Sequence, residues 1–373
     1  MTGVPIIYRE QDVKGRSTYS MLSVAYTPAF HIFISKRCRY ECDYCHFPQA
    51  ISPLPPSPKQ FRAYLRTAQR MGAWQVNLVA GEGIERLPEI VKTVKYYGFK
   101  NWFDYLYHLC SLTLDARGRQ PLTPVLDVGA LPVKELKKLA EVVPLLRLNL
   151  DVVDGALAET VHAGAEHKTV QLRTLGLKDV GRAKIPLATG VRVGMGETAE
   201  SWLEAVRIVN EVQEQFGNVT GFYLTPFAPE AGSKLAGAHP VTNEVFQQAV
   251  KMVREALHSD IPLVAEVYHR MALAPEAVIC GAFDLGGIKI ADSGRFDLDM
   301  LDSLSATVET LGKLNIELTK VPVLREKFRM SHRFSRQIEG NLRRFDGLNA
   351  VADGEGDGEG ADAEGDSVGA VAF

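Results

Sequence analysis

Three cysteines form the most reactive group in the chain. Cys38, Cys42 and Cys45 follow one another in a C-x3-C-x2-C spacing. Three thiolates on one short loop can bind three irons of a cubane iron–sulfur cluster. The fourth iron then has no protein ligand, and it can chelate the amino and carboxylate groups of a small molecule. The spacing therefore predicts a 4Fe–4S cluster with one open iron.

A zinc site is the other chemistry that this loop could support, with His46 as the fourth ligand. Structural zinc usually takes paired ligands from two separated places, and the sequence has no second C-x-x-C. The two remaining cysteines, Cys110 and Cys280, stand alone and are expected to be buried small hydrophobes. Three clustered cysteines out of five do not resemble a disulfide framework. The cluster is favoured, and zinc stays open.

Strand-like and helix-like segments alternate along the chain and must position this loop. The expected strands cover residues 30–34, 75–79, 124–128, 146–150, 187–193 and 222–224. Strands separated by helices imply right-handed βαβ units and a parallel sheet. Six units are too many for a small open sheet, so we expect a partial TIM-type (β/α)6 barrel. Its functional loops should leave the carboxyl ends of the strands, and the cysteines do follow the first strand.

Composition places the barrel between two terminal segments. The expected division is a lead-in at 1–20, the barrel at 21–300, a C-terminal helical extension at 301–348 and an acidic, glycine-rich tail at 349–373. Residues 353–366 contain seven acidic and no basic side chains, so a disordered, solubilising tail is predicted. No apolar run is long enough to span a bilayer, and charged residues interrupt the N-terminus. We expect a cytoplasmic protein without membrane partners.

Two glycine-rich turns follow the second and fifth expected strands. The first is Gly81-Glu82-Gly83, and the second ends the stretch from Gly190 to Glu197. Together with the cysteine loop, they resemble the motifs of the radical S-adenosylmethionine (SAM) superfamily. The resemblance implies a 4Fe–4S cluster and SAM as cofactors, and cleavage of SAM to a 5′-deoxyadenosyl radical. It also implies that Gly81 and Glu82 receive the SAM amino group.

The stretch 190–197 has the G-x-I-x-G-x-x-E spacing of that superfamily. The resemblance makes Gly194 and Glu197 part of a backbone platform for adenine. Arg192 stands where an apolar residue is usual. It either contacts the substrate or faces away from the barrel interior.

Four more residues are candidates for holding SAM. Tyr44 could pack beside the adenine or only fill the loop. Asn149 and Asp151 end the fourth strand and could hold a ribose or the substrate, although Asp151 or Asp154 could instead cap a helix. Arg173 could pair with the SAM carboxylate or lie on a solvated helix face.

Within the superfamily, the chain resembles the radical SAM subunit of 7,8-didemethyl-8-hydroxy-5-deazariboflavin synthase over roughly residues 18 to 300. The stretches that carry this likeness are 97–99, 104–110, 124–131, 161–173, 184–197 and 281–288. The resemblance implies a lyase that closes the central ring of the coenzyme F420 chromophore and releases ammonia. Its substrate would be a tyrosine–ribityluracil adduct. A second radical SAM subunit and a reductant such as ferredoxin or flavodoxin would be partners.

Two alternatives remain. Residues 148–151 resemble biotin synthase and 225–229 resemble maturases, which leaves open a radical SAM paralogue acting on another small molecule. Sulfur insertion is disfavoured because no further cysteines are grouped. The basic stretch from 320 to 344 suggests a zinc- or nucleic-acid-binding protein, but no aromatic stacking pattern accompanies it, so a nucleic-acid partner is not expected.

Overall fold

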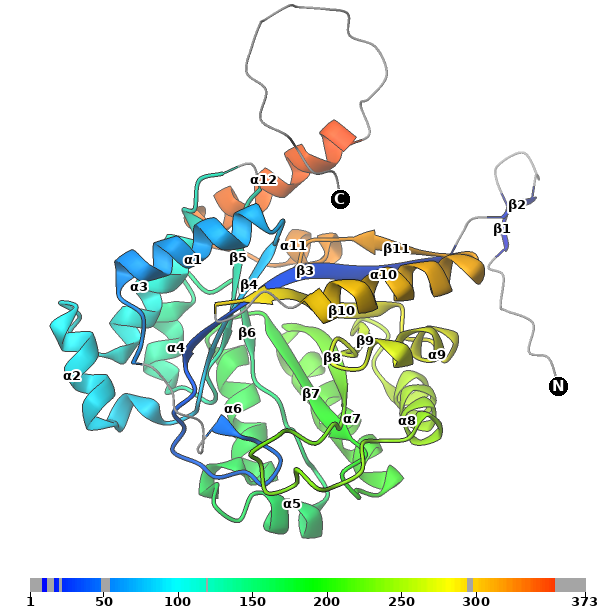
Figure 1. Ribbon diagram of the computed structural model, residues 1–373, viewed down its shortest axis with the longest axis horizontal. Helices are drawn as coiled ribbons and strands as arrows, with labels where there is room; N and C mark the ends of the chain where they lie inside the picture. Colours follow the sequence, from blue (N-terminus) through cyan, green and yellow to red (C-terminus); the bar gives the residue numbers. More distant parts are fainter. Residues whose placement is uncertain are drawn as a thin grey trace, which may run out of the picture.

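A computed structural model describes residues 9–11, 17–19, 22–47, 54–118, 120–293 and 298–352 of the chain (Figure 1). Strands β1 (Arg9–Gln11) and β2 (Ser17–Tyr19) form a small antiparallel pair. The tail at 353–366, expected to be disordered, lies outside the described residues. Among the helices of the described part, none is long and apolar enough to cross a membrane.

Eight parallel strands form a closed barrel. They are β3 (Leu22–Ser35), β4 (Gln75–Ala80), β5 (Thr123–Asp127), β6 (Leu145–Arg147), β7 (Leu187–Val193), β8 (Val219–Pro226), β9 (Leu263–Ala265) and β10 (Asp284–Asp292). Each strand pairs with the next, and β10 pairs with β3 to close the ring. All six expected strands are present.

The prediction of a partial (β/α)6 barrel is wrong, because β9 and β10 complete the ring. Neither strand carries a strong local signal. β9 has three residues, and β10 contains Gly286 and Gly287, which are weak strand formers. Their strand conformation depends on pairing with neighbours: β10 lies beside β3, more than 200 residues earlier in the chain. Closure leaves no unpaired sheet edge in the ring.

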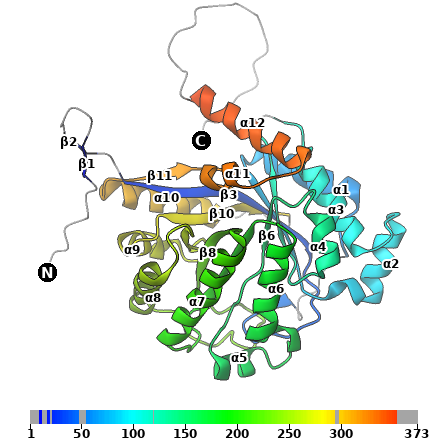
Figure 2. The ribbon, with the colours of Figure 1, turned by 180° about the vertical axis from the view of Figure 1, so that it is seen from behind.

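Helices cover the outside of the barrel (Figures 1 and 2). They are α1 (Pro58–Arg70), α2 (Pro88–Tyr96), α3 (Trp102–Leu114), α4 (Val133–Leu139), α5 (Gly155–Val161), α6 (Val170–Arg182), α7 (Ala199–Phe216), α8 (Asn243–Ala256), α9 (Ala274–Ile279) and α10 (Leu298–Lys313). Local sequence sets their ends: Ser57 and Gln60 form a capping box at the start of α1. Cys110 of α3 is buried, as expected, whereas Cys280 is only half-buried.

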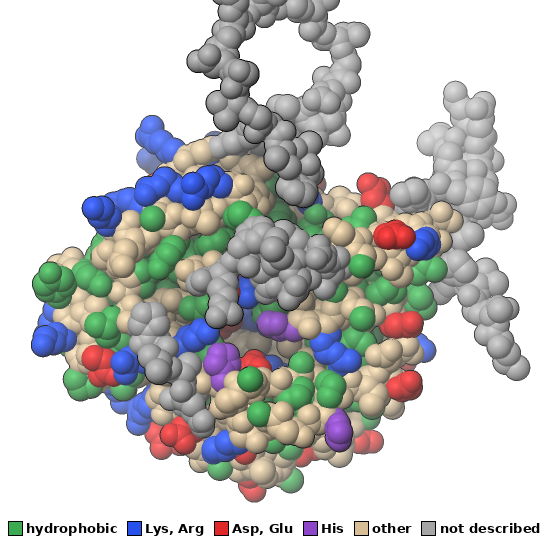
Figure 3. Space-filling view, in the orientation of Figure 1, with side chains coloured by type: hydrophobic (Ala, Val, Ile, Leu, Met, Phe, Trp, Pro, Cys, Tyr) green, Lys and Arg blue, Asp and Glu red, His purple; other side chains and the backbone are tan. Residues whose placement is uncertain are grey.

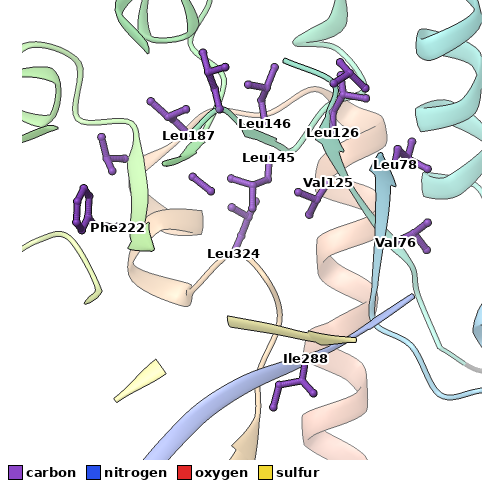
Figure 4. Packing of buried hydrophobic residues seen from close by; sticks show 14 of the residues in the cluster. Val76, Leu78, Val125, Leu126, Leu145, Leu146, Leu187, Phe222, Ile288 and Leu324 are labelled. Atoms are coloured by element: carbon purple, nitrogen blue, oxygen red, sulfur yellow. The ribbon is translucent and has the colours of Figure 1, made fainter. Parts of the chain in front are cut away.

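Three further elements follow the barrel. They are β11 (Ile316–Lys320), α11 (Glu326–Ser331) and α12 (Arg336–Ala352). β11 pairs in parallel with the first residues of β3. The segment 321–325 closes the amino-terminal end of the barrel, where Leu324 is fully buried near Leu145 (Figure 4). Arg325 of this segment pairs with Asp284 at the start of β10.

Some residues of the basic stretch are used inside the fold. Arg329 binds Asp346 at 2.7 Å, and Arg344 donates to the carbonyl of Ala116 at 3.0 Å. Asn341 of α12 donates to the carbonyls of Leu114 and Leu122. These contacts join α11 to α12 and α12 to the barrel, so Arg329 and Arg344 have a structural role.

Candidate active site

The cysteine loop leaves the carboxyl end of β3 and is held by backbone hydrogen bonds from three sides. Arg39 N donates to Glu82 O at 2.9 Å, Glu41 N to Gly164 O at 3.2 Å, and Asp43 N to Val161 O at 2.9 Å. The loop after β8 adds Leu235 N, which donates to the carbonyl of Asp43. The loop is therefore fixed before any cofactor binds.

The three thiols are free and lie in surroundings suited to metal-bound sulfur. Tyr40 N donates to Cys38 Sγ at 3.4 Å, and Phe47 N donates to Cys45 Sγ at 3.5 Å. Burial raises the pKa of the Cys42 thiol, and it raises the pKa of Cys45 to about 11. Such thiols need a metal to become thiolates near neutral pH. Backbone N–H groups aimed at sulfur also tune bound clusters, so the donor set fits an iron–sulfur group.

The zinc alternative gains no support from this arrangement. His46, the proposed fourth ligand, places Nδ1 2.5 Å from Glu230 Oε2, which leaves Nε2 as its nitrogen for a metal. Within the described ranges, no three cysteine, histidine or acidic side chains converge as the ligands of a single ion would. A zinc ion requires that convergence, whereas a cubane binds each thiolate to a different iron.

Gly81 brings the second motif against the cysteine loop. A Cβ atom at this position would stand 2.0 Å from Arg37 O and 2.6 Å from Cys38 Cα. Only glycine permits this approach. The cysteine loop and the Glu82 turn are therefore in direct backbone contact, as a shared cofactor site would require.

Glu82 and Arg173 meet in a buried ion pair. Arg173 Nη2 lies 2.6 Å from Glu82 Oε2, Arg173 Nη1 lies 3.1 Å from Oε1, and Ala130 N also donates to Oε1. Arg173 is 3% exposed, which excludes the solvated helix face. The two residues expected to bind the two ends of the SAM methionine are thus neighbours, although they lie 91 residues apart in the sequence.

Asp151 is the centre of a second charged group beside the cysteine loop. It has a left-handed backbone, with φ of 63°, and Lys168 Nζ lies 2.8 Å from its Oδ2. Arg192 Nε lies 3.8 Å from Asp151 Oδ1. Burial alone would raise the pKa of Asp151, but Lys168 and Arg192 hold it well below its usual range. Arg192 therefore faces the barrel interior.

Tyr44 is buried within this group. Its hydroxyl accepts a hydrogen bond from Lys168 Nζ at 3.1 Å, and the hydroxyl oxygen lies 2.9 Å from His162 Nε2. The ammonium can only donate, so the hydroxyl accepts from Lys168, and its hydrogen bond with a neutral His162 takes the direction that the histidine tautomer sets. Burial and the Lys168 charge lower the pKa of His162 to about 4, which agrees with that protonation state. The Arg192 guanidinium lies 4.6 Å from the centre of the Tyr44 ring.

Asn149 carries a buried acceptor without a partner. No hydrogen bond from the described residues reaches Asn149 Oδ1. Native proteins rarely leave such an atom unsatisfied, so it is a fitting contact for a ligand hydroxyl. The helix-capping alternative applies instead to Asp154, which accepts from Leu157 N at the start of α5.

The turn after β7 is held by Glu197. Its carboxylate accepts from Gly194 N at 2.6 Å, Met195 N at 2.8 Å and the indole of Trp202 at 2.9 Å. Gly194 has φ of 99° and packs against Val241 so closely that a Cβ would overlap it. Glu197 thus shapes the turn, and the half-buried backbone of Gly194 is the part that could face a ligand.

The sequence analysis did not identify a charged group that lies inside the barrel. Both terminal nitrogens of Arg147, at the end of β6, bind Glu266, which follows β9. Thr225 Oγ1 also donates to Glu266 Oε2 at 2.7 Å. Burial alone would raise the pKa of Glu266, but Arg147 lowers it to about 2. Asp127, at the end of β5, lies 3.9 Å from Arg147 Nε.

Polar alternation along one strand end could have revealed this group. Arg147, Asn149 and Asp151 occupy alternate positions and therefore face the same side. His31 of β3 and Asn77 of β4 extend the polar lining, with 2.7 Å between His31 Nε2 and Asn77 Nδ2. In Figure 3, charged and histidine side chains gather around a hollow near the middle of the face shown. The site therefore has candidate cofactor-binding residues at the rim of the barrel and polar side chains inside it.

Comparisons with known proteins give relatives in sequence and in fold. No family model matches the chain. It is 28% identical over 270 residues to a 7,8-didemethyl-8-hydroxy-5-deazariboflavin synthase of Methanothermobacter thermautotrophicus, covering 71% of this chain and 80% of that one. The synthase of the same name from Synechocystis is 29% identical over 301 residues, covering 79% and 91%.

Solved structures share the fold at low identity. The [FeFe]-hydrogenase maturase HydG has a TM-score of 0.64 at 14% identity, covering 85% of this chain and 68% of that one. Methylornithine synthase PylB has a TM-score of 0.60 at 15% identity, covering 80% and 84%.

The chain therefore shares the barrel fold of these two proteins. In sequence it is similar to 7,8-didemethyl-8-hydroxy-5-deazariboflavin synthase, as the sequence analysis predicted.

Proposed function

We propose that Cys38, Cys42 and Cys45 bind a 4Fe–4S cluster, and that the enzyme uses it to cleave SAM in the synthesis of a deazaflavin. When bound, the cluster and SAM supply a 5′-deoxyadenosyl radical. One observation carries this proposal: Gly81 packs directly on Cys38, which sets the buried Glu82–Arg173 pair beside the cysteine loop.

In this proposal the chain's own residues bind and orient SAM. Glu82 receives its amino group and Arg173 its carboxylate, so the ion pair between them opens to admit a zwitterion with matching charges. Asn149 Oδ1, which lacks a donor among the described residues, accepts from a ribose hydroxyl. Asp151 and Tyr44 form the polar wall behind that ribose. The backbone of Gly194 faces the adenine, and Glu197 holds the turn.

The proposed substrate is the tyrosine–ribityluracil adduct, and the proposed reaction is ring closure with release of ammonia. Support comes from the relatives named 7,8-didemethyl-8-hydroxy-5-deazariboflavin synthase, which match most of the barrel. The polar interior around Arg147, Glu266 and Asp127 suits a substrate rich in hydrogen-bonding groups. A second radical SAM subunit would supply the adduct, and a ferredoxin or flavodoxin would supply electrons.

Anaerobic reconstitution with iron, sulfide, reductant and SAM tests the proposal. The holoenzyme should form 5′-deoxyadenosine, and addition of the adduct should give a blue-fluorescent deazaflavin and ammonia. Formation of 5′-deoxyadenosine without deazaflavin would reject the substrate but keep the class, and a radical SAM paralogue acting on another small molecule would replace it. Absence of both products, with iron bound, would reject the whole proposal.

A further inference from the structure

His31 is a buried polar side chain of the barrel interior that the proposed SAM contacts do not use. It lies on β3, four residues before the strand ends at Ser35. At 3.3 Å per residue, this places it about 13 Å along the strand from the cysteine loop. The residue is 6% exposed, so solvent reaches only a small part of its surface. His31 therefore lies deeper in the barrel than the residues proposed to bind SAM.

Two buried amide side chains of β4 fix the imidazole of His31. Gln75 Nε2 donates to Asn77 Oδ1, and Asn77 Nδ2 lies 2.7 Å from His31 Nε2. The oxygen of Asn77 is already used as an acceptor, so its amide nitrogen is the atom that faces His31. An amide nitrogen can only donate. His31 Nε2 is therefore the acceptor in this hydrogen bond.

The hydrogen of a neutral His31 must then be on Nδ1. Burial and the charge of nearby Lys289 lower the pKa of His31 to about 3, so the imidazole is neutral near pH 7. A neutral imidazole whose Nε2 accepts carries its hydrogen on Nδ1. Within the part of the chain that the structure describes, no second hydrogen bond accompanies the one to Asn77. The Nδ1–H group is thus a donor that the fold leaves without an acceptor.

Aromatic rings hold the imidazole from its sides. The Tyr268 ring, which follows β9, meets the His31 ring edge to face with 5.6 Å between their centres, and the Phe33 ring lies 6.4 Å away. Edge-to-face pairs at such distances are favourable. With Asn77 bound to Nε2 and aromatic neighbours beside the ring, the Nδ1–H group has a fixed direction. A donor fixed in this way binds an acceptor at a smaller cost in conformational entropy.

We propose that His31 donates a hydrogen bond from Nδ1 to a carbonyl oxygen of the substrate, and that Asn77 is the positioning residue that directs this donor. The inference rests on the proposed function, because the uracil ring of the adduct carries two carbonyl oxygens. The two groups match in charge as well as in hydrogen bonding. A neutral N–H group satisfies a neutral oxygen without leaving an unpaired charge in the buried interior.

The test measures binding of the adduct to the SAM-loaded holoenzyme. His31→Phe keeps a ring but removes the donor, so the Kd and KM for the adduct should rise about 3- to 30-fold, as expected for one buried hydrogen bond. The KM for SAM should not change. His31→Asn should recover part of the loss, because its amide nitrogen can replace Nδ1. His108→Phe, on α3 outside the barrel, is the matched control and should bind the adduct as the parent does.

Two analogues of the adduct identify the atom that His31 contacts. In each, sulfur replaces one of the two carbonyl oxygens and is a weaker acceptor. One of them should bind the parent more weakly than the adduct does, and it should bind the parent and His31→Phe equally. If both bind the parent as tightly as the adduct, the inference is overturned whether or not the variants fold. A His31-dependent loss that appears only when a ring nitrogen is methylated would make His31 an acceptor and would also overturn it.

Asn77→Leu separates positioning from a general structural role. It should raise the Kd for the adduct in the parent but not in the His31→Phe background, because Asn77 acts through His31. Equal losses in the two backgrounds would show that Asn77 does not direct the donor. Circular dichroism and the cluster absorbance confirm that each variant is folded and loaded.

Failure of the inference and failure of the proposed function give different results. If the parent converts the adduct to a deazaflavin and His31→Phe binds it equally well, the function stands and the role of His31 is rejected. If the parent binds the adduct through His31 but forms no deazaflavin, the carbonyl contact stands and the reaction is wrong. If the parent neither binds nor converts the adduct, both are rejected.

Discussion

The two ends of the barrel differ in how far their polar groups are paired within the fold. At the amino-terminal end, Asp284 is paired with Arg325 and accepts from Gly286 N at 2.8 Å, and Leu324 fills the opening. At the carboxyl end, Asn149 Oδ1 lacks a hydrogen-bond donor from the described residues, and three free thiols lie on one loop. One end pairs its polar groups within the fold, whereas the other carries the groups that the proposed cofactors would contact. Substitutions at the amino-terminal end should therefore change stability, and substitutions at the carboxyl end should change activity.

The largest expected effect is the loss of a cysteine. Cys42→Ala should leave the protein folded but reduce bound iron and 5′-deoxyadenosine formation to below detection, because a cubane with only two protein thiolates is not retained. Iron analysis, cluster absorbance and product quantification measure this. Cys280→Ala, away from the loop, should retain both. Full activity of Cys42→Ala would show that the cysteine loop is not part of the active site.

The next effect tests the contact between two motifs. Gly81→Ala would place Cβ 2.0 Å from Arg37 O, so the cysteine loop must shift. Overpacking of this kind costs about 1–3 kcal/mol, and SAM cleavage should fall about tenfold or more. Gly155→Ala is the matched control, since no atom lies within 4 Å of the added Cβ. Equal activities of the two variants would show that the contact does not position the site.

A substitution at the amino-terminal end should change stability and leave activity unchanged. Leu324→Ala removes a fully buried side chain and should lower the free energy of unfolding by about 2–5 kcal/mol. The KM for SAM should stay the same, because the substitution lies at the end away from the cysteine loop. Chemical denaturation gives the first quantity and initial rates the second. Leu314→Ala, at an exposed position, should change stability little. A changed KM would mean that the two ends are coupled.

The smallest effect concerns a buried histidine between the two ends. Burial and nearby Lys289 lower the pKa of His31 to about 3, against an ordinary value of 6.5. A group with a lowered pKa contributes stability that is present above pH 6.5 and is lost as pH falls towards 3. His31→Asn should reduce this slope by up to about 1.4 kcal/mol per pH unit. Urea denaturation between pH 7 and 5 measures it, with exposed His239→Asn as the control.

Much of the site could be predicted because its signals are local. The cysteine spacing, the glycine turns and the ends of the expected strands depend on neighbouring residues. Arg173 was expected to bind the SAM carboxylate, but its contact with Glu82 could not be deduced, because that contact depends on how the barrel brings the start of α6 to the turn after β4. Arg147 and Glu266 were missed for the same reason, since their strands meet only across the closed barrel.

The sequence by itself predicted the class of chemistry, because a C-x3-C-x2-C loop after a strand restricts the metal group that it can hold. It also predicted six strands, all of which are present. Only the tertiary structure decided that β9 and β10 close the ring, that Arg192 faces inward and that Asp127 lies beside Arg147. These features depend on distances between residues far apart in the chain, and local propensity contains no information about such distances.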